Sequence, residues 1–180
     1  MIRGLAELAR VTGGVLRGDD VSFGAVLSDS RAIEPGALFV ALRGERFDGH
    51  QFLAEVQQGG AAGALVEHHV PVTLPQVVVR DALEGLTAFA AAWRADFQGT
   101  VIGVTGSNGK TTVKEMTGAI LACAGPTLVT RGNLNNHIGV PLTLSRLEAT
   151  HRFAVIEMGA NHQREIAHLA AVARPDVGLV

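Results

Sequence analysis

The feature that most constrains the fold is a glycine-rich segment at residues 105–112, Thr-Gly-Ser-Asn-Gly-Lys-Thr-Thr. A β-branched run, Thr100–Val104, precedes it, and a helical pattern follows it, with an apolar face made of Val113, Met116, Ile120 and Cys123. Strand, glycine-rich turn and helix in this order are typical of phosphate-binding loops. The segment therefore predicts an α/β fold with a nucleotide site at the turn, and an ordinary strand–helix turn is the competing interpretation.

The residue types within the segment suit a triphosphate and its metal ion. Gly106 and Gly109 let backbone N–H groups turn toward a phosphate without a Cβ in the way, and the helix that follows directs its positive N-terminus at the same place. Lys110 is expected at the β- and γ-phosphates, and the Thr111 hydroxyl is expected on Mg²⁺. The match to G-x-x-x-x-G-K-[ST] is incomplete, because Val104 occupies the position of the first glycine. The predicted ATP-binding residues are Thr105, Gly106, Ser107, Asn108, Gly109, Lys110, Thr111 and Thr112.

A magnesium site also needs a carboxylate, and Glu157 is the candidate. It ends the apolar run Phe153–Ile156, so it is expected at the carboxyl end of a parallel strand, the edge at which α/β sheets bind ligands. A carboxylate buried there needs a cation, which Mg²⁺ or a lysine supplies. The competing interpretation is a solvated or capping residue.

The polar segment Gly132–Pro141 concentrates side-chain amides between two apolar stretches. Amides donate and accept hydrogen bonds in fixed geometry, which suits substrate positioning, and Asn135 and Asn136 are the candidates. Asx-turns that only shape the loop are the alternative. Cys123 is expected to be a small core residue on its helix face. The scattered histidines show no zinc-ligand spacing.

The chain has 180 residues, enough for one sizeable domain or two small ones. We expect a boundary near residue 98, giving an α/β domain at 1–98 and, at 99–180, the first part of a parallel-sheet domain with an unfinished fourth strand. The first domain is expected to have strands within 21–27, 37–42, 64–66 and 77–79, with a helix capped by Asp48 and another capped by Asp81. The unfinished sheet suggests that the sequence is the first part of a longer protein.

Two polar clusters in the first half stand at the ends of predicted elements. Ser28-Asp-Ser-Arg31 follows a strand, and Phe47-Asp-Gly-His50 precedes a helix. Such clusters can meet a polar ligand, although caps and turns are the simpler explanation.

The overall charge argues against several partners. Fifteen basic and seventeen acidic residues give a formal net charge of −2, which disfavours nucleic acid or a membrane surface as a partner. The single cysteine and the lack of an apolar run of about 20 residues are typical of a cytoplasmic protein. We also expect the protein to be a monomer.

Together these segments resemble the Mur ligases, the ATP-dependent amide-forming enzymes of bacterial cell-wall synthesis. Residues 28–31, 35–42 and 48–50 resemble the family's N-terminal UDP-sugar-binding domain, and residues 103–112 match its phosphate loop, including the missing first glycine. Residues 132–141 and 156–162 are most similar to the member that acts on a UDP-N-acetylmuramoyl-tripeptide. His137 departs from that pattern, because an acidic residue is expected there.

The resemblance implies roles for the matching residues. Lys110 and the loop amides would hold ATP phosphates, Thr111 and Glu157 would ligate Mg²⁺, and Asn135 and Asn136 would position the acceptor carboxylate. The uridine-nucleotide end of the substrate would meet Ser28, Ser30, Arg31, Asp48 and His50. The implied reaction transfers the γ-phosphoryl group of ATP to the acceptor carboxylate, and the amine of D-alanyl-D-alanine then attacks the acyl phosphate.

Three alternatives stay open. A ligase that adds the third amino acid to a UDP-N-acetylmuramoyl-dipeptide would share the first domain and the loop. The 180 residues could instead form a substrate- or nucleotide-binding module without turnover, or belong to an unrelated P-loop ATPase that drives a partner.

Overall fold

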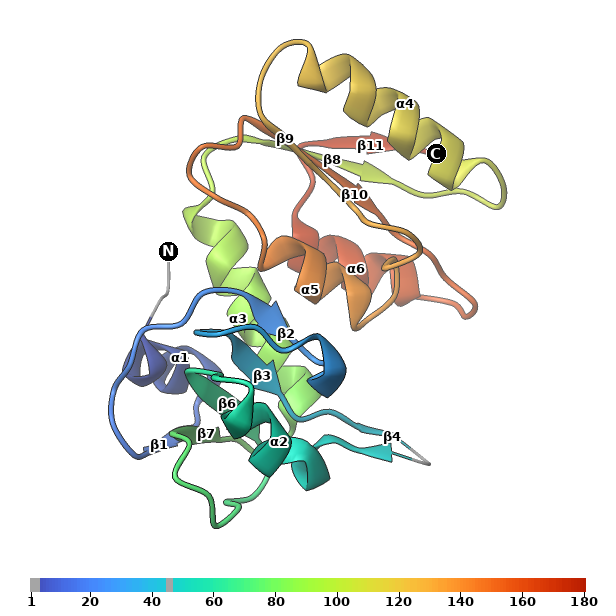
Figure 1. Cartoon of the computed structure of the whole chain (residues 1–180). Helices are drawn as coiled ribbons and strands as arrows, with labels where there is room; N and C mark the ends of the chain where they lie inside the picture. The colour runs from blue at the N-terminus through green and yellow to red at the C-terminus, as the bar shows by residue number, and fades with distance from the viewer. Residues whose placement is uncertain (1–3, 45–46) are drawn as a thin grey trace. The chain divides into compact units, whose positions relative to one another are not determined.

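The computed structural model describes residues 4–44 and 47–180 (Figure 1). By its internal contacts the chain forms two compact units, divided between Phe89 and Ala90. This division falls inside one helix, α3 (Ala82–Asp96). The predicted domain boundary near residue 98 stays a prediction, and each unit is described by itself.

The first unit is built on a five-stranded sheet. Its strands lie in the order β1 (Val15–Arg17), β7 (Gln76–Val78), β6 (Gly63–Val66), β3 (Leu38–Val40) and β2 (Val26–Leu27). All neighbours are parallel except β1, which runs antiparallel to β7. A separate antiparallel pair joins β4 (Arg43–Gly44) and β5 (Phe47–Asp48). The sequence did not predict β1, β4 or β5, because each of these short strands contains a charged residue and lies in no continuous apolar run.

Helices cover both faces of this sheet. On one face, α2 (Leu53–Gln58) contributes Leu53 and Val56 to a buried cluster with Ala64 and Val66 of β6. Strand side chains alternate between faces, so Gly63 and Leu65 point to the other side. There α1 (Leu5–Thr12) and the start of α3 approach closely, since a Cβ on Gly63 would lie 2.7 Å from Leu5 and a Cβ on Gly85 would lie 3.2 Å from Leu65.

Two predicted caps are present in the first unit. The Asp81 carboxylate accepts a hydrogen bond from the Glu84 backbone N–H at 2.8 Å, which satisfies a donor of the first turn of α3. Asp48 caps the short 3₁₀ helix η2 (Gly49–Phe52) that leads into α2. A second 3₁₀ helix, η1 (Ser30–Ala32), follows β2 and is capped by Asp29.

The second unit contains a four-stranded sheet in which all neighbouring strands are parallel. The order is β11 (Val177–Leu179), β8 (Thr100–Val104), β10 (Phe153–Glu157) and β9 (Thr127–Val129). The predicted parallel sheet is therefore confirmed. Because Glu157 pairs in register with Val104, the end of β10 and the start of the glycine-rich turn lie at the same edge.

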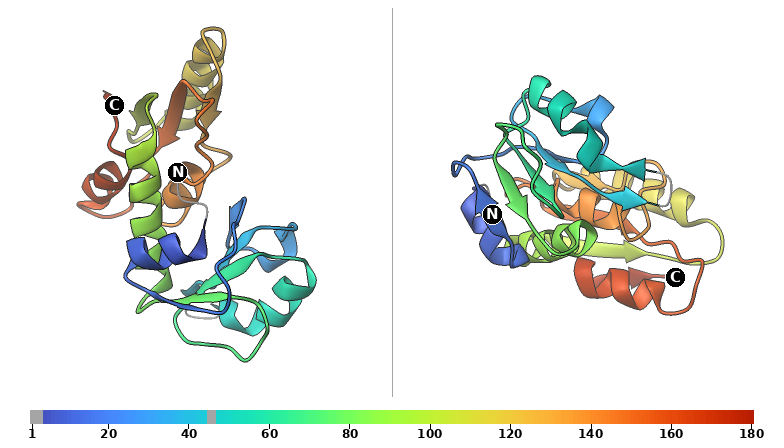
Figure 2. Two further views of the ribbon diagram at one scale, coloured as in Figure 1. Left: turned by 90° about the vertical axis from the view of Figure 1, so that its left-hand side faces the viewer. Right: turned by 90° about the horizontal axis from the view of Figure 1, so that it is seen from below.

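Three further helices flank this sheet, as two views show (Figures 1 and 2). The helix α4 (Lys110–Ala122) covers one face, and α5 (Gly139–Leu144) and α6 (Glu165–Ala173) lie on the other. The helix α6 ends just before Arg174 and Pro175, which agrees with the restriction that a proline places on the residue before it. The helix α5 was not predicted. Within the described residues, no helix combines the length and the apolar character needed to cross a membrane.

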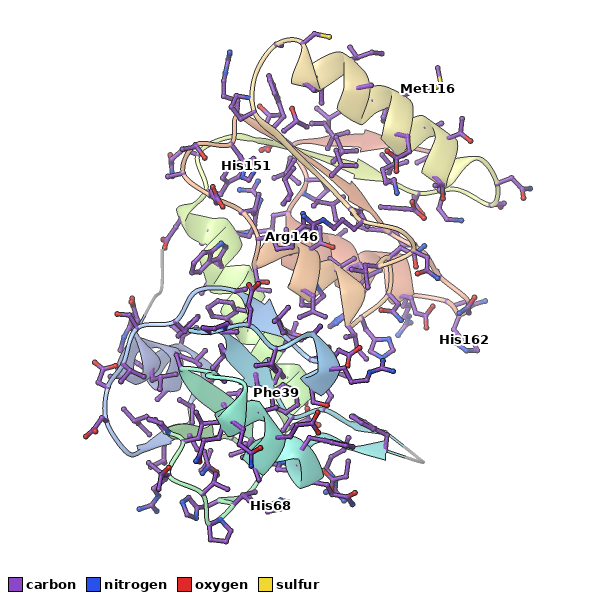
Figure 3. The ribbon with its side chains drawn as sticks, viewed as in Figure 1. Phe39, His68, Met116, Arg146, His151 and His162 are labelled. Carbon is purple, nitrogen blue, oxygen red and sulfur yellow. The ribbon has the colours of Figure 1, made fainter. Side chains whose placement is uncertain are left out.

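The prediction for the buried face of α4 is wrong. Val113, Met116 and Ile120 are 41%, 61% and 69% exposed, and Cys123 is exposed rather than part of the core. Met116 is labelled on the outer side of the helix in Figure 3. The face against the sheet carries Lys114 and Gly118 instead. A Cβ on Gly118 would lie 2.6 Å from Val129, so this glycine lets the helix approach β9 and thereby decides which face is buried.

Candidate functional site

The glycine-rich turn has an open backbone that no side chain of the turn caps. Gly106 and Gly109 have φ values of 134° and 77°, a region that favours glycine. Gly109 is the N-cap of α4, and no side chain makes a capping hydrogen bond there. The N–H groups of a first helical turn have no partner within the helix, and they form an anion site together with the helix dipole. The Lys110 ammonium stays at this turn by donating to the Gly106 carbonyl at 2.9 Å.

Gly103 stands one residue before Val104, which occupies the position of the motif's first glycine. Its role is to let Met158 and Pro175 pack closely against β8. It lies inside β8, where a Cβ would come within 2.5 Å of the Met158 methyl group and 3.1 Å of Pro175. This glycine therefore allows close contact over the sheet, and the turn that could hold a phosphate begins only after Val104.

Glu157 lies opposite the glycine-rich turn, as predicted from its position at a strand end. The residue is 1% exposed, and its carboxylate is held from two sides. The Asn135 side-chain amide donates to Oε1 at 2.8 Å, and the Thr111 hydroxyl donates to Oε2 at 3.3 Å. The structure thus brings together three of the predicted site residues, although they are up to 46 positions apart in the sequence.

A residue that the sequence analysis missed completes this cluster. The Lys114 side chain is 0% exposed, and its Nζ lies 3.5 Å from Oε2 of Glu157. The same ammonium donates to the Gly132 carbonyl at 3.2 Å and pairs with Glu115 at 3.0 Å. Its spacing of four residues from Lys110 places both on one side of the helix, which is the sequence signal that could have found it.

The donor set fits a magnesium ion bound together with phosphates. Mg²⁺ takes oxygen ligands and is usually held by one or two carboxylates plus substrate phosphates rather than by a cage of protein groups. Glu157 and Thr111 supply a carboxylate and a hydroxyl next to the anion-binding turn. Among residues 4–44 and 47–180, no group of three or more His, Cys, Asp or Glu residues could hold a metal ion by itself.

The two predicted asparagines have different surroundings. Asn135 is half-buried against Gly159, where a Cβ would lie 2.9 Å from the Asn135 side chain, and its amide is committed to Glu157. Asn136 accepts from the backbone N–H groups of Ile138 at 3.1 Å and Gly139 at 2.8 Å. It therefore shapes the start of α5, while Asn135 orients the buried carboxylate.

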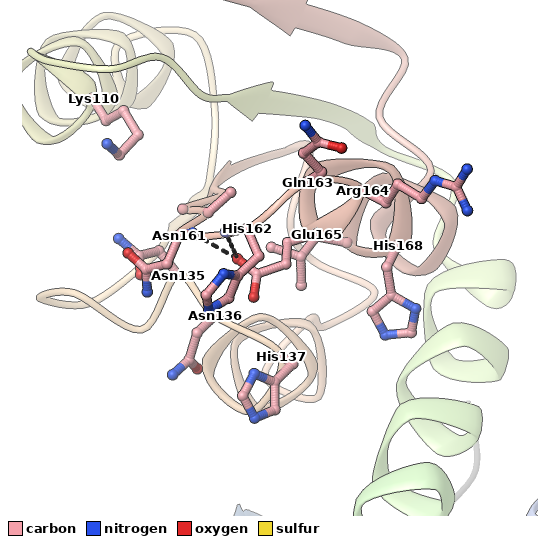
Figure 4. Close-up of a pocket in the computed structure, with 13 residues that line it drawn as sticks. Lys110, Asn135, Asn136, His137, Asn161, His162, Gln163, Arg164, Glu165 and His168 are labelled. Atoms are coloured by element: carbon pink, nitrogen blue, oxygen red, sulfur yellow. Dashed lines mark hydrogen bonds between the residues drawn. The ribbon is translucent and has the colours of Figure 1, made fainter.

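A cavity of about 760 Å³ adjoins the turn and contains both asparagines (Figure 4). It extends from Lys110 to the first turns of α6 and is lined mainly by polar groups. The residues are Lys110, Asn135, Asn136, His137, Gly159, Ala160, Asn161, His162, Gln163, Arg164, Glu165, His168 and Leu169. The cavity has the size of a small-molecule site.

Glu165 organises the wall of this cavity formed by residues 161–164. Its carboxylate accepts from the backbone N–H groups of Asn161 at 2.6 Å and His162 at 3.0 Å (Figure 4). These two hydrogen bonds lower the pKa of Glu165, and the nearby His162 and His137 act in the same direction. The segment then passes through Arg164, which has a left-handed φ of 71°.

In the first unit, the two predicted polar clusters follow neighbouring parallel strands. Ser28 comes directly after β2, and the Gly49 backbone N–H of the second cluster donates to the carbonyl of Leu42, just after β3, at 2.9 Å. Both clusters therefore lie toward the carboxyl edge of the sheet. The exposed Arg31 guanidinium pairs with Asp29 through two bonds, at 2.9 Å and 2.7 Å. This side-chain pairing, followed by the bond from the Arg31 backbone N–H, lowers the pKa of Asp29 to about 2. Ser30 is half-buried beside them.

His50 is placed differently from the other predicted substrate residues. It is 5% exposed, its Nδ1 lies 2.6 Å from the Asp48 carboxylate, and its Nε2 accepts from the Glu67 backbone N–H at 2.8 Å. Its ring stacks on His68 with centroids 4.2 Å apart. Both ring nitrogens are thus used inside the unit, so His50 is positioned to hold Asp48 rather than to contact a ligand.

The chain matches two family descriptions over most of its length. Residues 22–94 match "Mur ligase family, catalytic domain", and residues 104–180 match "Mur ligase middle domain". Among curated proteins, the chain is 48% identical to the UDP-N-acetylmuramoyl-tripeptide–D-alanyl-D-alanine ligase of Escherichia coli (strain K12), with 98% of this chain and 39% of that protein covered. It is 37% identical to the ligase of the same name from Bacillus subtilis (strain 168), with 99% and 40% covered.

The chain is also similar to solved structures of proteins with related names. The chain is similar to a UDP-N-acetylmuramoylalanyl-D-glutamyl-2,6-diaminopimelate–D-alanyl-D-alanyl ligase from Acinetobacter baumannii, with a TM-score of 0.90, 43% identity, and 96% of this chain and 40% of that chain covered. It is also similar to a MurF ligase from Thermotoga maritima in complex with ADP, with a TM-score of 0.74, 35% identity, and 84% and 36% covered. The chain spans about two fifths of the length of these relatives.

Proposed function

The chain belongs to the Mur ligase family, and on that premise we propose that it provides the nucleotide- and acceptor-binding parts of an ATP-dependent ligase. The proposed reaction joins D-alanyl-D-alanine to a UDP-N-acetylmuramoyl-tripeptide in peptidoglycan precursor synthesis. The observation that carries this proposal is the buried Glu157 carboxylate facing the uncapped N-terminus of α4 across the Thr111 hydroxyl. The named relatives support the choice of substrates.

The proposed nucleotide site uses the turn at residues 105–112. The first-turn N–H groups of α4 and the Lys110 ammonium would donate to ATP phosphate oxygens. Lys110 would have to leave the Gly106 carbonyl, which holds it at 2.9 Å in this structure, to reach them. Thr111 and Glu157 would ligate Mg²⁺, whose charge would offset that of the phosphates during transfer.

The proposed chemistry solves the problem that a carboxylate is a poor electrophile. An oxygen of the acceptor carboxylate attacks the γ-phosphorus of ATP, and ADP leaves. The amine of D-alanyl-D-alanine then attacks the acyl carbon, the amide bond forms, phosphate leaves, and the amine nitrogen loses a proton. The residues of this chain would contribute by positioning and by charge stabilisation, which account for most of the catalysis in phosphoryl transfer.

The acceptor would lie along the cavity next to the turn. Asn135 and Asn136 both line the cavity, and Asn135 also donates to Glu157, which supports the proposal that this pair would position the acceptor carboxylate near the γ-phosphate. In the first unit, Ser28, Ser30, Arg31 and Asp48 stand near one sheet edge and would meet the uridine-nucleotide end. His50 would act through Asp48.

The experiment that tests this function is phosphate release by the complete gene product carrying these residues. We expect release to require ATP, Mg²⁺, the UDP-sugar tripeptide and D-alanyl-D-alanine together. Release that does not depend on the dipeptide would contradict the proposal. Comparing the tripeptide with the dipeptide as acceptor tests the alternative that the protein adds the third amino acid.

The binding-module alternative is tested on the 180-residue chain. Calorimetry with ATP and Mg²⁺, and separately with the UDP-sugar tripeptide, reports whether each ligand binds. Ligand binding without product formation supports a binding module, whereas amide formation by the chain alone contradicts it. A cytoplasmic location and a monomeric state stay predictions.

A further inference from the structure

Lys114 stands out because lysine is almost never fully buried unless it is paired. Its side chain has no exposed surface, and its three oxygen partners come from different parts of the second unit. They are Glu115 on α4 itself, the Gly132 carbonyl after β9, and Glu157 at the end of β10. An ammonium has three donors, so these acceptors can use all of them.

The environment of Glu157 explains why a cation is needed at this point. Its Oε1 is held by Asn135, a neutral donor, and its Oε2 by Thr111, another neutral donor. Lys114, 3.5 Å from Oε2, is the cation paired with this carboxylate among the described residues. A buried carboxylate without a charge partner is costly, so the metal-free site depends on this pairing.

From this arrangement we propose that Lys114 is a built-in counter-ion for Glu157. It neutralises and positions the carboxylate before a divalent cation arrives, and it competes with that cation afterwards. Lys114 is therefore a positioning residue, which acts on the metal through Glu157. The inference deepens the proposed function, because it assigns the control of metal affinity at the same site.

The first test measures metal-free stability and needs no ligand. The variants are Lys114→Met, which keeps the length of the side chain without its charge, Glu157→Gln, and the double variant. We expect Lys114→Met to lower the unfolding temperature, and the double variant to recover part of that loss because the unpaired charge is gone. If Lys114→Met does not fold, recovery of folding in the double variant supports the proposal. Equal losses in the single and double variants overturn it.

The second test measures metal affinity. If Lys114 served only to stabilise the fold, its removal would not tighten metal binding. Mg²⁺ is titrated into the wild type and into Lys114→Met in the presence of ADP. Calorimetry and the rise in unfolding temperature report how tightly each protein binds the metal. Removal of the competing ammonium should tighten metal binding by on the order of tenfold and enlarge the temperature rise. Unchanged or weaker binding in Lys114→Met overturns the proposal.

Glu115→Gln is the matched control. It removes the charge of another carboxylate that pairs with the Lys114 ammonium, and the side chain of Glu115 is 64% exposed. We expect its metal affinity to equal that of the wild type, and a shift as large as that of Lys114→Met would overturn the proposal. Failure of the wild type to bind ADP with Mg²⁺ would contradict the proposed function only. The metal-free test would then still decide the role of Lys114.

Discussion

Lys110 shows how one residue can be held ready for a ligand. Its ammonium donates to the carbonyl of Gly106 in the same turn, so it already lies at the proposed phosphate site. Lys110→Ala removes this cation without touching the buried core, since the residue is only half-buried.

We therefore expect Lys110→Ala to lower the ligase turnover of the complete gene product by about 10²–10³-fold, the usual cost of removing one group that stabilises transition-state charge. Phosphate release measures the rate, and circular dichroism checks that the fold is intact. Near wild-type turnover would contradict the assignment of the phosphate loop.

The Asp29–Arg31 pair gives a pH-dependent prediction. The pairing lowers the pKa of Asp29 from 3.8 to about 2, so the carboxylate favours the folded state above pH 4 and loses that contribution as the pH falls through about 2. In an NMR titration we expect a midpoint near 2. In Arg31→Ala the midpoint should rise but stay below 3.8, because the backbone N–H of residue 31 still donates to Asp29. Arg10→Ala, which removes a separate surface pair with Glu7, should leave it unchanged. A midpoint near 3.8 in the wild type would contradict the structure.

At the scale of elements, α4 shows that an apolar stripe does not by itself identify the buried face of a helix. Its sheet-facing side is set by the small Gly118, which permits close approach to β9, and by Lys114, which finds oxygen partners there. The side chains of Val113, Met116 and Ile120 point elsewhere and are exposed.

This arrangement predicts the effect of polar substitutions on α4. Met116→Gln and Ile120→Gln should each change the free energy of unfolding by no more than about 0.5 kcal/mol, as is usual for exposed positions. Leu144→Ala, at a fully buried position on α5, is the contrast and should cost about 2–5 kcal/mol. Chemical denaturation of the 180-residue chain measures all three. A large loss at Ile120 would mean that the stripe is buried after all.

At the scale of the whole molecule, the chain divides its proposed ligands between two units. The phosphate loop, Glu157 and the cavity lie within residues 90–180, whereas Ser28–Arg31 and Asp48 lie in the first unit. Each set of residues is built on its own sheet, with its own buried core.

Hydrogen exchange on the 180-residue chain can follow the two units separately. ATP with Mg²⁺ should slow amide exchange at residues 105–113, where first-turn N–H groups would bind phosphate, and leave residues 28–31 unchanged. The UDP-sugar tripeptide should slow exchange at residues 28–31. Lys110→Ala should lose the first effect and keep the second. Protection by ATP confined to the first unit would contradict the proposed division.

The sequence by itself determined the features that depend on neighbouring residues. Local periodicity and the backbone preferences of glycine and proline account for the order of strand, glycine-rich turn and helix at residues 100–122 and for the parallel sheet of the second unit. Local signals also account for the cap at Asp81 and for the end of α6 before Pro175.

Only the tertiary structure decided which distant residues meet and which surfaces are buried. Lys114, Gly132, Asn135 and Glu157 come together because parallel strands end at one sheet edge, and no local pattern encodes their distances. The exposed stripe of α4 and the enclosed ring of His50 likewise depend on the elements that pack against them. The physical reason is that burial and pairing are properties of contacts, and contacts between residues far apart in sequence exist only once the chain has folded.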